Sequence, residues 1–244
     1  MEFALSKFKR EVEVTASFCI ITCDYHLKHL KPLLDSLPEQ TEAPNEIILV
    51  SSGVDLNRMD FVPETIKICG KEVPVVHINS RDRFFAGRAR NLAADHSSSE
   101  ILVFIDGDDI PHPQKTEISK TVLTNPHIAE ALGFEEVDMA CHGWIGNKQF
   151  KKYDSIPSGV VTRAVRQSGQ QLLIGSSNRP LAHGPIAIKT KIMTDGIHRQ
   201  NEKQERAQDT AFCCIGLDKG LRIAHIDLPL IYYSNAGMFP EYNW

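Results

Sequence analysis

The chain has 244 residues, of which 42% are hydrophobic and 24% are charged, and its formal net charge is −4. This is an ordinary globular composition, with ample apolar material for the core of one large domain. A negative net charge argues against broad electrostatic binding to nucleic acid, so we expect no nucleic-acid partner.

The sequence also bears on location and redox state. Charged residues are mixed through positions 1–13, without the apolar core of a signal peptide, and no apolar run is long enough to span a bilayer. We therefore expect a cytoplasmic protein, with peripheral contact to a membrane as an alternative. The cysteines show no paired CxxC spacing, so we expect reduced, buried thiols rather than a zinc site. They are Cys19, Cys23, Cys69, Cys141, Cys213 and Cys214.

The first half of the chain predicts alternating strands and helices. Apolar runs at 14–21, 46–50, 73–78 and 101–105 predict strands, and the segments 27–37 and 86–96 predict helices. This alternation predicts a parallel sheet, in which all strand ends lie at one edge. We expect Thr22, Ser51, Arg81 and Asp106, which follow those strands, to converge on a nucleotide cleft.

The second half has a different texture. Residues 135–140 predict a strand, and the stretch from 143 to 183, which contains Gly, Ser and Gln, predicts few regular elements. Strand character returns at 184–188, the segment 204–217 predicts a helix with one buried face, and 222–226 and 228–233 predict two closing strands.

A local excess of positive charge lies between positions 148 and 182. One interpretation is a solvated loop. The other is that one or two of these cations neutralise a leaving phosphate or guide an anionic acceptor. The basic residues are Lys148, Lys151, Lys152, Arg163, Arg166 and Arg179, against the single acid Asp154.

The most informative segment is the run from Ile101 to Asp109, in which five apolar residues lead into Asp106, Asp108 and Asp109. Carboxylates are hard ligands suited to Mg²⁺ or Mn²⁺, and open α/β sheets bind ligands beyond the carboxyl ends of their strands. We interpret the run as a site for a metal-bound nucleoside diphosphate. Strand-end aspartates also cap helices or lie solvated in turns, so the triplet alone is a weak signal.

In combination with other segments, this run resembles the Asp-x-Asp motif of glycosyltransferase family 2, whose members have the GT-A fold. The resemblance covers most of the chain. It is carried by Ala89-Arg90-Asn91-Leu92-Ala93, Phe104-Ile105-Asp106-Gly107-Asp108-Asp109, Gly184-Pro185-Ile186-Ala187-Ile188-Lys189, Gln208-Asp209-Thr210-Ala211-Phe212-Cys213 and Gly220-Leu221-Arg222-Ile223.

The resemblance implies a single α/β domain of the GT-A fold, with a nucleotide-sugar-binding half at 14–112 and an acceptor-binding and catalytic half at 113–244. It implies transfer of a sugar from a nucleoside-diphosphate sugar to the hydroxyl of a glycan or another acceptor, with inversion of the anomeric carbon and a Mn²⁺ or Mg²⁺ cofactor.

The resemblance also assigns roles to single residues. Asp106 would hydrogen-bond the ribose and Asp108 would bind the divalent ion, while Asp109 would bind the metal or cap; we treat all three as candidate metal ligands. Asp209 would be the general base, kept ionised by the positive end of its helix, with Glu205 as backup. The other candidate donor-binding residues are Thr22, Ser51, Asp55, Arg81 and Arg90, with Arg83 as a further cation near the phosphates.

Two departures from the family pattern limit these assignments. Family members often have a base-recognising acid after the second strand, where this chain has Ser51 and Ser52, so we favour a UDP-sugar only weakly. Many members also have a metal-binding histidine near the last strand, where this chain reads Ile231-Tyr232-Tyr233-Ser234-Asn235. His183 and His225 are the nearest histidines, and water could complete the coordination instead.

Other classes fit less well but two stay open. A catalytically inactive module would keep the sugar-nucleotide pocket, as the serines and the absent histidine allow. A sugar-phosphate nucleotidylyltransferase would share the sheet and the carboxylates, but it opens with a Gly-rich loop where this chain has Thr22-Cys23-Asp24-Tyr25. A haloacid-type phosphatase needs its nucleophilic aspartate after the first strand, whereas this acidic run follows the fourth.

Overall fold

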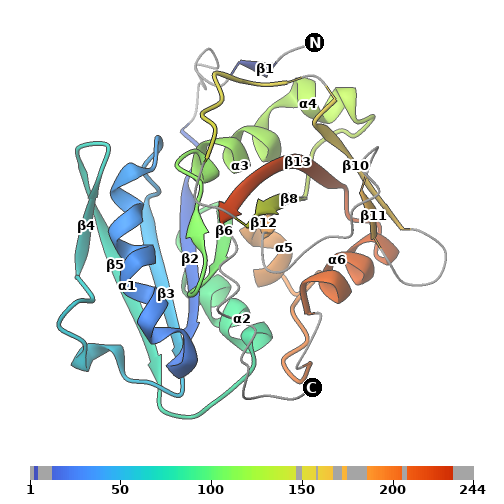
Figure 1. Cartoon of the computed structure of the whole chain (residues 1–244). Helices are drawn as coiled ribbons and strands as arrows, with labels where there is room; N and C mark the ends of the chain where they lie inside the picture. The colour runs from blue at the N-terminus through green and yellow to red at the C-terminus, as the bar shows by residue number, and fades with distance from the viewer. Residues whose placement is uncertain are drawn as a thin grey trace.

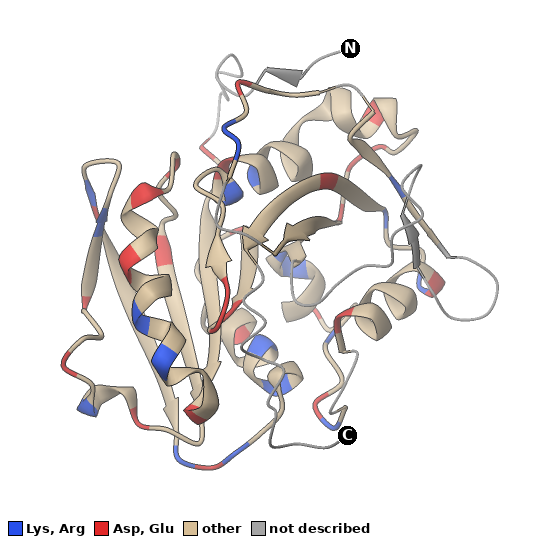
Figure 2. Cartoon of the chain, viewed as in Figure 1, with Lys and Arg blue, Asp and Glu red and all other residues tan. Residues whose placement is uncertain are grey.

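The structure is a computed structural model that describes residues 3–4, 13–146, 150–157, 159–166, 172–174, 186–204 and 208–232. Within these residues one long mixed sheet runs through the molecule, and a small pair of strands lies apart from it (Figure 1). Figure 2 shows Lys and Arg spread over helices, loops and outer strands and interleaved with Asp and Glu.

The helices and strands follow in chain order. They are β1 (Phe3–Ala4), β2 (Ala16–Cys23), η1 (Asp24–His26), α1 (Leu27–Ser36), η2 (Leu37–Glu39), β3 (Glu46–Ser52), η3 (Leu56–Arg58), β4 (Thr65–Ile68), β5 (Lys71–Ser80), α2 (Ala86–His96), β6 (Ile101–Asp106), β7 (Ile110–Pro111), α3 (Lys115–Thr124), α4 (Pro126–Ala131), β8 (Met139–Ile145), β9 (Ser155–Ile156), β10 (Val161–Arg166), β11 (Leu172–Ile174), β12 (Ile186–Lys189), α5 (Thr190–Thr194), α6 (Gln208–Asp218) and β13 (Ile223–Tyr232).

The main sheet has the strand order β11-β10-β13-β8-β12-β6-β2-β3-β5-β4. Strands β6, β2, β3 and β5 are parallel neighbours, so their carboxyl ends share one edge. Strand β12 pairs antiparallel with both β6 and β8 and thereby joins the two halves of the chain. The sheet is therefore continuous from one half to the other.

Each face of the sheet has its own apolar core, because successive side chains of a strand point to opposite faces. On β2, Phe18 and Ile20 pack with α1, α3 and α4, whereas Cys19 and Ile21 pack with α2, α5 and α6. Figure 1 shows these two groups of helices on either side of the sheet. The buried, nearly continuous apolar strands of the first half follow from this double coverage.

The predicted elements of the first half agree with the structure to within a few residues. The hairpin strand β4 and the helices α3 and α4 have no counterpart among the predicted elements. Four of the cysteines are buried free thiols, as expected, but Cys69 is an exposed free thiol with a positive φ of 50°. It precedes Gly70 in the tight turn between β4 and β5, and this turn keeps it at the surface.

The second half differs from the prediction in three places. The strand predicted at 135–140 begins at Met139, and the carboxylate of Asp138 just before it accepts hydrogen bonds from Arg222 at 2.7–2.9 Å. The described part of the stretch 143–183, for which few regular elements were predicted, contains the short strands β9, β10 and β11, which the sequence did not locate. The two closing strands are one strand, β13, which passes Pro229 through register shifts against β8.

Candidate active site

The strand ends of the first half converge as predicted. Ile21 is the register partner of Asp106, and Thr22 is the partner of Ser51. The turn after β6 then crosses over β2, where the Gly107 N–H donates to the Ile21 carbonyl at 2.7 Å. A Cβ atom on Gly107 would lie 2.6 Å from Thr22 Oγ1, so this close crossing requires glycine.

A cavity of about 230 Å³ opens at this edge, and we call it the strand-end cavity. It combines aromatic and aliphatic walls with a few polar groups, a pattern common in small-molecule sites. Its described lining is Ile21, Thr22, Cys23, His26, Ser52, Phe84, Phe85, Ala86, Ala89, Asp106 and Gln208.

Arg90 links the acidic run to the second half of the chain. It is 3% exposed, and its Nη2 donates to Asp106 Oδ1 at 2.8 Å. Its other terminal nitrogen lies 3.5 Å from Gln208 Oε1, at the start of α6. One buried guanidinium therefore contacts two residues of the strand-end cavity, Asp106 from β6 and Gln208 from α6.

His26 lies opposite Asp108, with 3.7 Å between Nε2 and Oδ2. Burial disfavours the imidazolium, but the hydrogen bond with Cys23 and the carboxylates of Asp108 and Asp106 outweigh it and raise the pKa of His26 to about 9. Burial raises the pKa of Asp108, opposed by the charge of His26 and reinforced by that of Asp106. His26 was not among the predicted site residues, although its position just beyond the end of β2 places it at the same edge of the sheet as the acidic run.

The carboxylates fit a hard divalent ion that arrives with a diphosphate. Asp108 is buried beside Asp106, so a further positive charge there would stabilise both ionised carboxylates. Mg²⁺ is commonly held by one or two carboxylates together with substrate phosphates. In the described part of the chain no group of three or more His, Cys, Asp or Glu side chains is arranged to hold a metal ion.

Asp109 faces the protein interior. It is 2% exposed, and its charge acts on Lys115, which is fully buried at the start of α3. Burial lowers the pKa of Lys115 to about 7 even though Asp109 and Asp106 favour its charged form. Lys115 is hydrogen-bonded to His142, whose pKa is held well below its usual value by burial and by the charge of Lys115. This surrounding favours a structural role for Asp109 over direct contact with a metal.

Three predicted donor-binding residues are engaged elsewhere. Ser51 is fully buried and donates to the Val54 carbonyl at 2.8 Å. Asp55 accepts a hydrogen bond from the Asn57 N–H and lies 3.5 Å from the exposed Arg81. None of the three belongs to the described lining of the strand-end cavity.

Ser52, one position beyond Ser51, does line the cavity. Its hydroxyl donates to the Phe84 carbonyl at 2.8 Å and accepts from the Phe84 N–H at 2.7 Å, which fixes the segment before α2.

Arg83, predicted as a further cation near the phosphates, is bound to Asp24 and donates to Tyr25 Oη at 2.6 Å. Its guanidinium lies 4.8 Å from the centre of the Tyr25 ring. Arg83 is thus held at the end of β2.

Asp209 lies in the first turn of α6 and is 6% exposed. Its neighbour Gln208 lines the strand-end cavity, so the candidate base is next to a residue that Arg90 contacts. The backup candidate Glu205 lies outside the described residues, as do His183, Tyr233, Lys148, Arg179 and the Gly184-Pro185 part of the family segment from Gly184 to Lys189.

Two further expectations concern His225 and the basic stretch. His225 is 3% exposed, and burial lowers its pKa to about 4, as expected for a neutral structural histidine.

In the basic stretch, Arg163 donates to the carbonyl oxygens of Leu132 and Gly133. Its guanidinium lies over the Phe134 ring, 4.4 Å from the ring centre. Arg163 therefore stabilises this turn.

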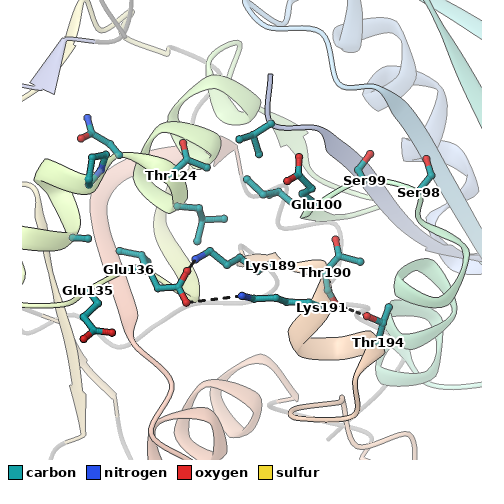
Figure 3. A pocket seen from close by; sticks show the side chains of 17 residues that line it. Ser98, Ser99, Glu100, Thr124, Glu135, Glu136, Lys189, Thr190, Lys191 and Thr194 are labelled. Carbon is teal, nitrogen blue, oxygen red and sulfur yellow. Dashed lines mark hydrogen bonds and ion pairs between the residues drawn. The ribbon is translucent and has the colours of Figure 1, made fainter. Parts of the chain in front are cut away.

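A second cavity, of about 520 Å³, lies at the opposite edge of the sheet, where β2 and β6 begin (Figure 3). Figure 3 shows Lys189 and Lys191 directed at Glu136, and Arg222 also donates to that carboxylate. The hydrogen bond from Lys189 lowers the pKa of Glu136 to about 2. Glu136 and these cations therefore pair with one another at the edge of the sheet opposite the acidic run.

Comparisons with known proteins agree with the fold. The model of Glycosyl transferase family 2 matches residues 17–219. An uncharacterized glycosyltransferase of Rickettsia bellii is 24% identical over 183 residues, which cover 75% of this chain and 23% of that protein. One of Haemophilus influenzae is 32% identical over 111 residues, which cover 45% of this chain and 35% of that protein.

Two solved structures share the fold at low sequence identity. S. aureus TarS 1–349 in complex with UDP has a TM-score of 0.59 and 16% identity, over 91% of this chain and 60% of that chain. The mannosyltransferase PcManGT from Pyrobaculum calidifontis, in complex with GDP-Man and Mn²⁺, has a TM-score of 0.55 and 15% identity, over 92% and 59%. The chain thus spans part of the length of each of these relatives.

No helix in the described part of the chain is both long and apolar enough to cross a bilayer.

The family model covers most of the chain, and the α/β sheet of this chain matches that of the solved transferases. The chain therefore belongs to glycosyl transferase family 2 and has the GT-A fold.

Proposed function

We propose that the protein is a metal-dependent, inverting glycosyltransferase that moves a sugar from a nucleoside-diphosphate sugar to an acceptor hydroxyl. The observation that carries this proposal is the contact of buried Arg90 with both Asp106 and Gln208, which places the acidic run and the start of α6 on one cavity. TarS bound to UDP and PcManGT bound to GDP-Man and Mn²⁺ support the donor class and a divalent ion.

The residues of the strand-end cavity would divide the work between the two substrates. Asp106 would hydrogen-bond the ribose of the donor and Asp108 would hold the divalent ion, with Arg90 adding positive charge beside Asp106. Thr22 and Ser52 lie in the wall of the cavity with Phe84 and Phe85, whose rings offer a surface for the nucleobase. A divalent ion, when bound with the donor, would stabilise the charge of the departing nucleoside diphosphate.

Asp209 would act on the acceptor. As the acceptor oxygen forms its bond to the anomeric carbon, the carboxylate takes the hydroxyl proton. The bond from that carbon to the phosphate oxygen breaks, and its electron pair leaves with the nucleoside diphosphate. A single displacement from the face opposite the phosphate inverts the anomeric carbon.

A nucleotide screen followed by one substitution tests this proposal. Thermal shifts with UDP, GDP and other nucleotides, with and without Mn²⁺, identify the base, because a ligand that binds the folded state raises its stability. Transfer and donor hydrolysis are then measured for the native chain, for Asp209→Asn and for Asp218→Asn, a control at the other end of α6. Asp209→Asn should lower kcat by roughly 10²–10⁴-fold and leave donor binding intact, while Asp218→Asn should resemble the native chain.

The same experiment tests the alternative of an inactive module. Such a protein would give the thermal shift with donor and Mn²⁺ but no transfer, and Asp209→Asn would then make no difference. A nucleotide shift that Mn²⁺ does not enlarge would contradict the metal dependence.

A further inference from the structure

The segment 198–204, which precedes α6, lies directly against α2. The side-chain amide of Asn91 is hydrogen-bonded to both backbone groups of Gln200. Nδ2 donates to the Gln200 carbonyl at 3.1 Å, and Oδ1 accepts from the Gln200 N–H at 3.0 Å. The same Nδ2 donates to Glu202 Oε1 at 3.0 Å. Asn91 is 2% exposed, and its two bonds with the Gln200 backbone are buried, where an unmade partner is costly.

Two more contacts lie on the same face of α2. A Cβ atom on Gly87 would lie 2.5 Å from the Asn201 carbonyl oxygen, so the segment touches the helix backbone there. Asp95 binds Arg199 through two parallel bonds of 2.6 and 2.8 Å. Residues four apart share one helix face, and Gly87, Asn91 and Asp95 therefore form a continuous track for the segment.

The segment is also fixed to α6. His198 stacks on Phe212, with 3.9 Å between the ring centres, and its Nε2 lies 2.6 Å from the Phe212 carbonyl oxygen. From α2, Arg90 contacts Gln208 in the first turn of α6 and Asp106 at the end of β6. A single rigid helix thus contacts both the acidic run and the approach to Asp209.

We propose that Asn91 is a positioning residue for Asp209: by clamping Gln200 to α2, it sets the distance between the candidate base and the donor site. This inference rests on the proposed function of Asp209. Asn91 itself touches neither substrate in this account. Its contribution is geometric, and a displacement of about 1 Å at a reacting group is enough to cost on the order of 10²-fold in rate.

The first test separates chemistry from binding. Asn91→Ala should lower kcat for transfer by roughly 10- to 100-fold, while the donor dissociation constant, measured with donor and Mn²⁺ in the absence of acceptor, stays near the native value because Arg90 and Asp106 are untouched. Asn125→Ala is the matched control. Asn125 is also buried, and its Oδ1 accepts from the His127 N–H at 2.9 Å at the start of α4, remote from the segment.

A second pair of variants tests the hydrogen bonds themselves. Asn91→Asp keeps the acceptor for the Gln200 N–H but places a carboxylate against the Gln200 carbonyl and Glu202, so its kcat should fall further than that of Asn91→Ala. Adding Glu202→Gln supplies an amide donor to the new carboxylate and should recover part of the lost kcat. A purely structural defect would not respond to this exchange.

Amide hydrogen exchange of Gln200 gives a readout that does not need activity. Its N–H should exchange much faster in Asn91→Ala than in the native chain, and Asn125→Ala should leave it protected. If kcat and donor affinity of Asn91→Ala fall together, in proportion to its stability as for Asn125→Ala, the positioning role is overturned. If the exchange changes as expected but the native chain performs no transfer, the clamp stands and the proposed function of Asp209 fails.

Discussion

Replacing Lys115 with methionine should stabilise the protein at neutral pH. The lysine is fully buried, and burial lowers its pKa from 10.5 to about 7 despite the favourable charges of Asp109 and Asp106. At about 1.36 kcal/mol per pKa unit, this difference corresponds to a cost of about 5 kcal/mol below pH 7. Leaving His142 without its hydrogen-bond partner takes back about 1–2 kcal/mol, so we expect a net gain of about 3 kcal/mol.

The sign of the pH dependence follows from proton binding. Between pH 7 and pH 10.5 the unfolded chain holds a proton on Lys115 that the folded protein has largely released, so this lysine makes the native protein more stable as the pH rises. The advantage of Lys115→Met should therefore shrink by about 2 kcal/mol from pH 7 to pH 9. Groups that titrate equally in both proteins cancel in this difference.

Urea unfolding followed by far-ultraviolet circular dichroism at pH 6, 7, 8 and 9 measures the difference. Lys120→Met is the control on the same helix: Lys120 is also buried, but its ammonium is paired with Glu42, so its loss should destabilise the protein. A difference between Lys115→Met and the native chain that does not vary with pH would refute the reasoning. So would a Lys115→Met variant less stable than the native chain at pH 7.

Three further predictions concern other buried or crowded positions. Burial raises the pKa of Glu46, but its hydrogen bonds with three serine side chains outweigh this effect and lower the pKa. Glu46→Gln should therefore lower the free energy of unfolding by about 2 kcal/mol at pH 7. Urea unfolding should show this difference vanishing as the pH falls below about 4.5. Gly107→Ala places a methyl group against Thr22 and should abolish the thermal shift with UDP or GDP and Mn²⁺; an unchanged shift would show that the turn has room to move. His26→Gln should lose up to about 3 kcal/mol below pH 6.5, because the raised pKa reflects a stabilised imidazolium, and the loss should disappear towards pH 9. A deficit that grows with pH would contradict the pairing of His26 with Asp108.

The sequence predicted those features that depend on local pattern. Apolar runs of strand length that alternate with helices specify a parallel sheet, and a parallel sheet places its strand ends at one edge. This was enough to bring Thr22 and Asp106 together and to place the acidic run beside a cavity. The sequence also named Arg90, which lies on the helix that precedes β6.

Features that depend on which face a side chain takes were not predictable in the same way. Ser51 and Ser52 are adjacent on β3, and a shift of one residue exchanges the two faces of a strand. The sequence therefore named Ser51, whereas Ser52 lines the cavity. The buried Lys115 and the placement of His26 opposite Asp108 depend on segments far apart in the chain, which no local period encodes. Lysine is also among the residues least often buried, so composition argued the other way for Lys115.

The position of β12 between β6 and β8 has a consequence for any attempt to divide the molecule. A fragment ending after residue 112 would keep β6 but lose its outer neighbour, and Ile101, Leu102 and Val103 would become the rim of an open sheet. An apolar rim of this kind readily recruits strands from other molecules. Truncation at that boundary should yield an aggregating product rather than a small nucleotide-binding domain. An exchange of the acceptor-binding halves of two relatives would have to keep β12 paired with β6.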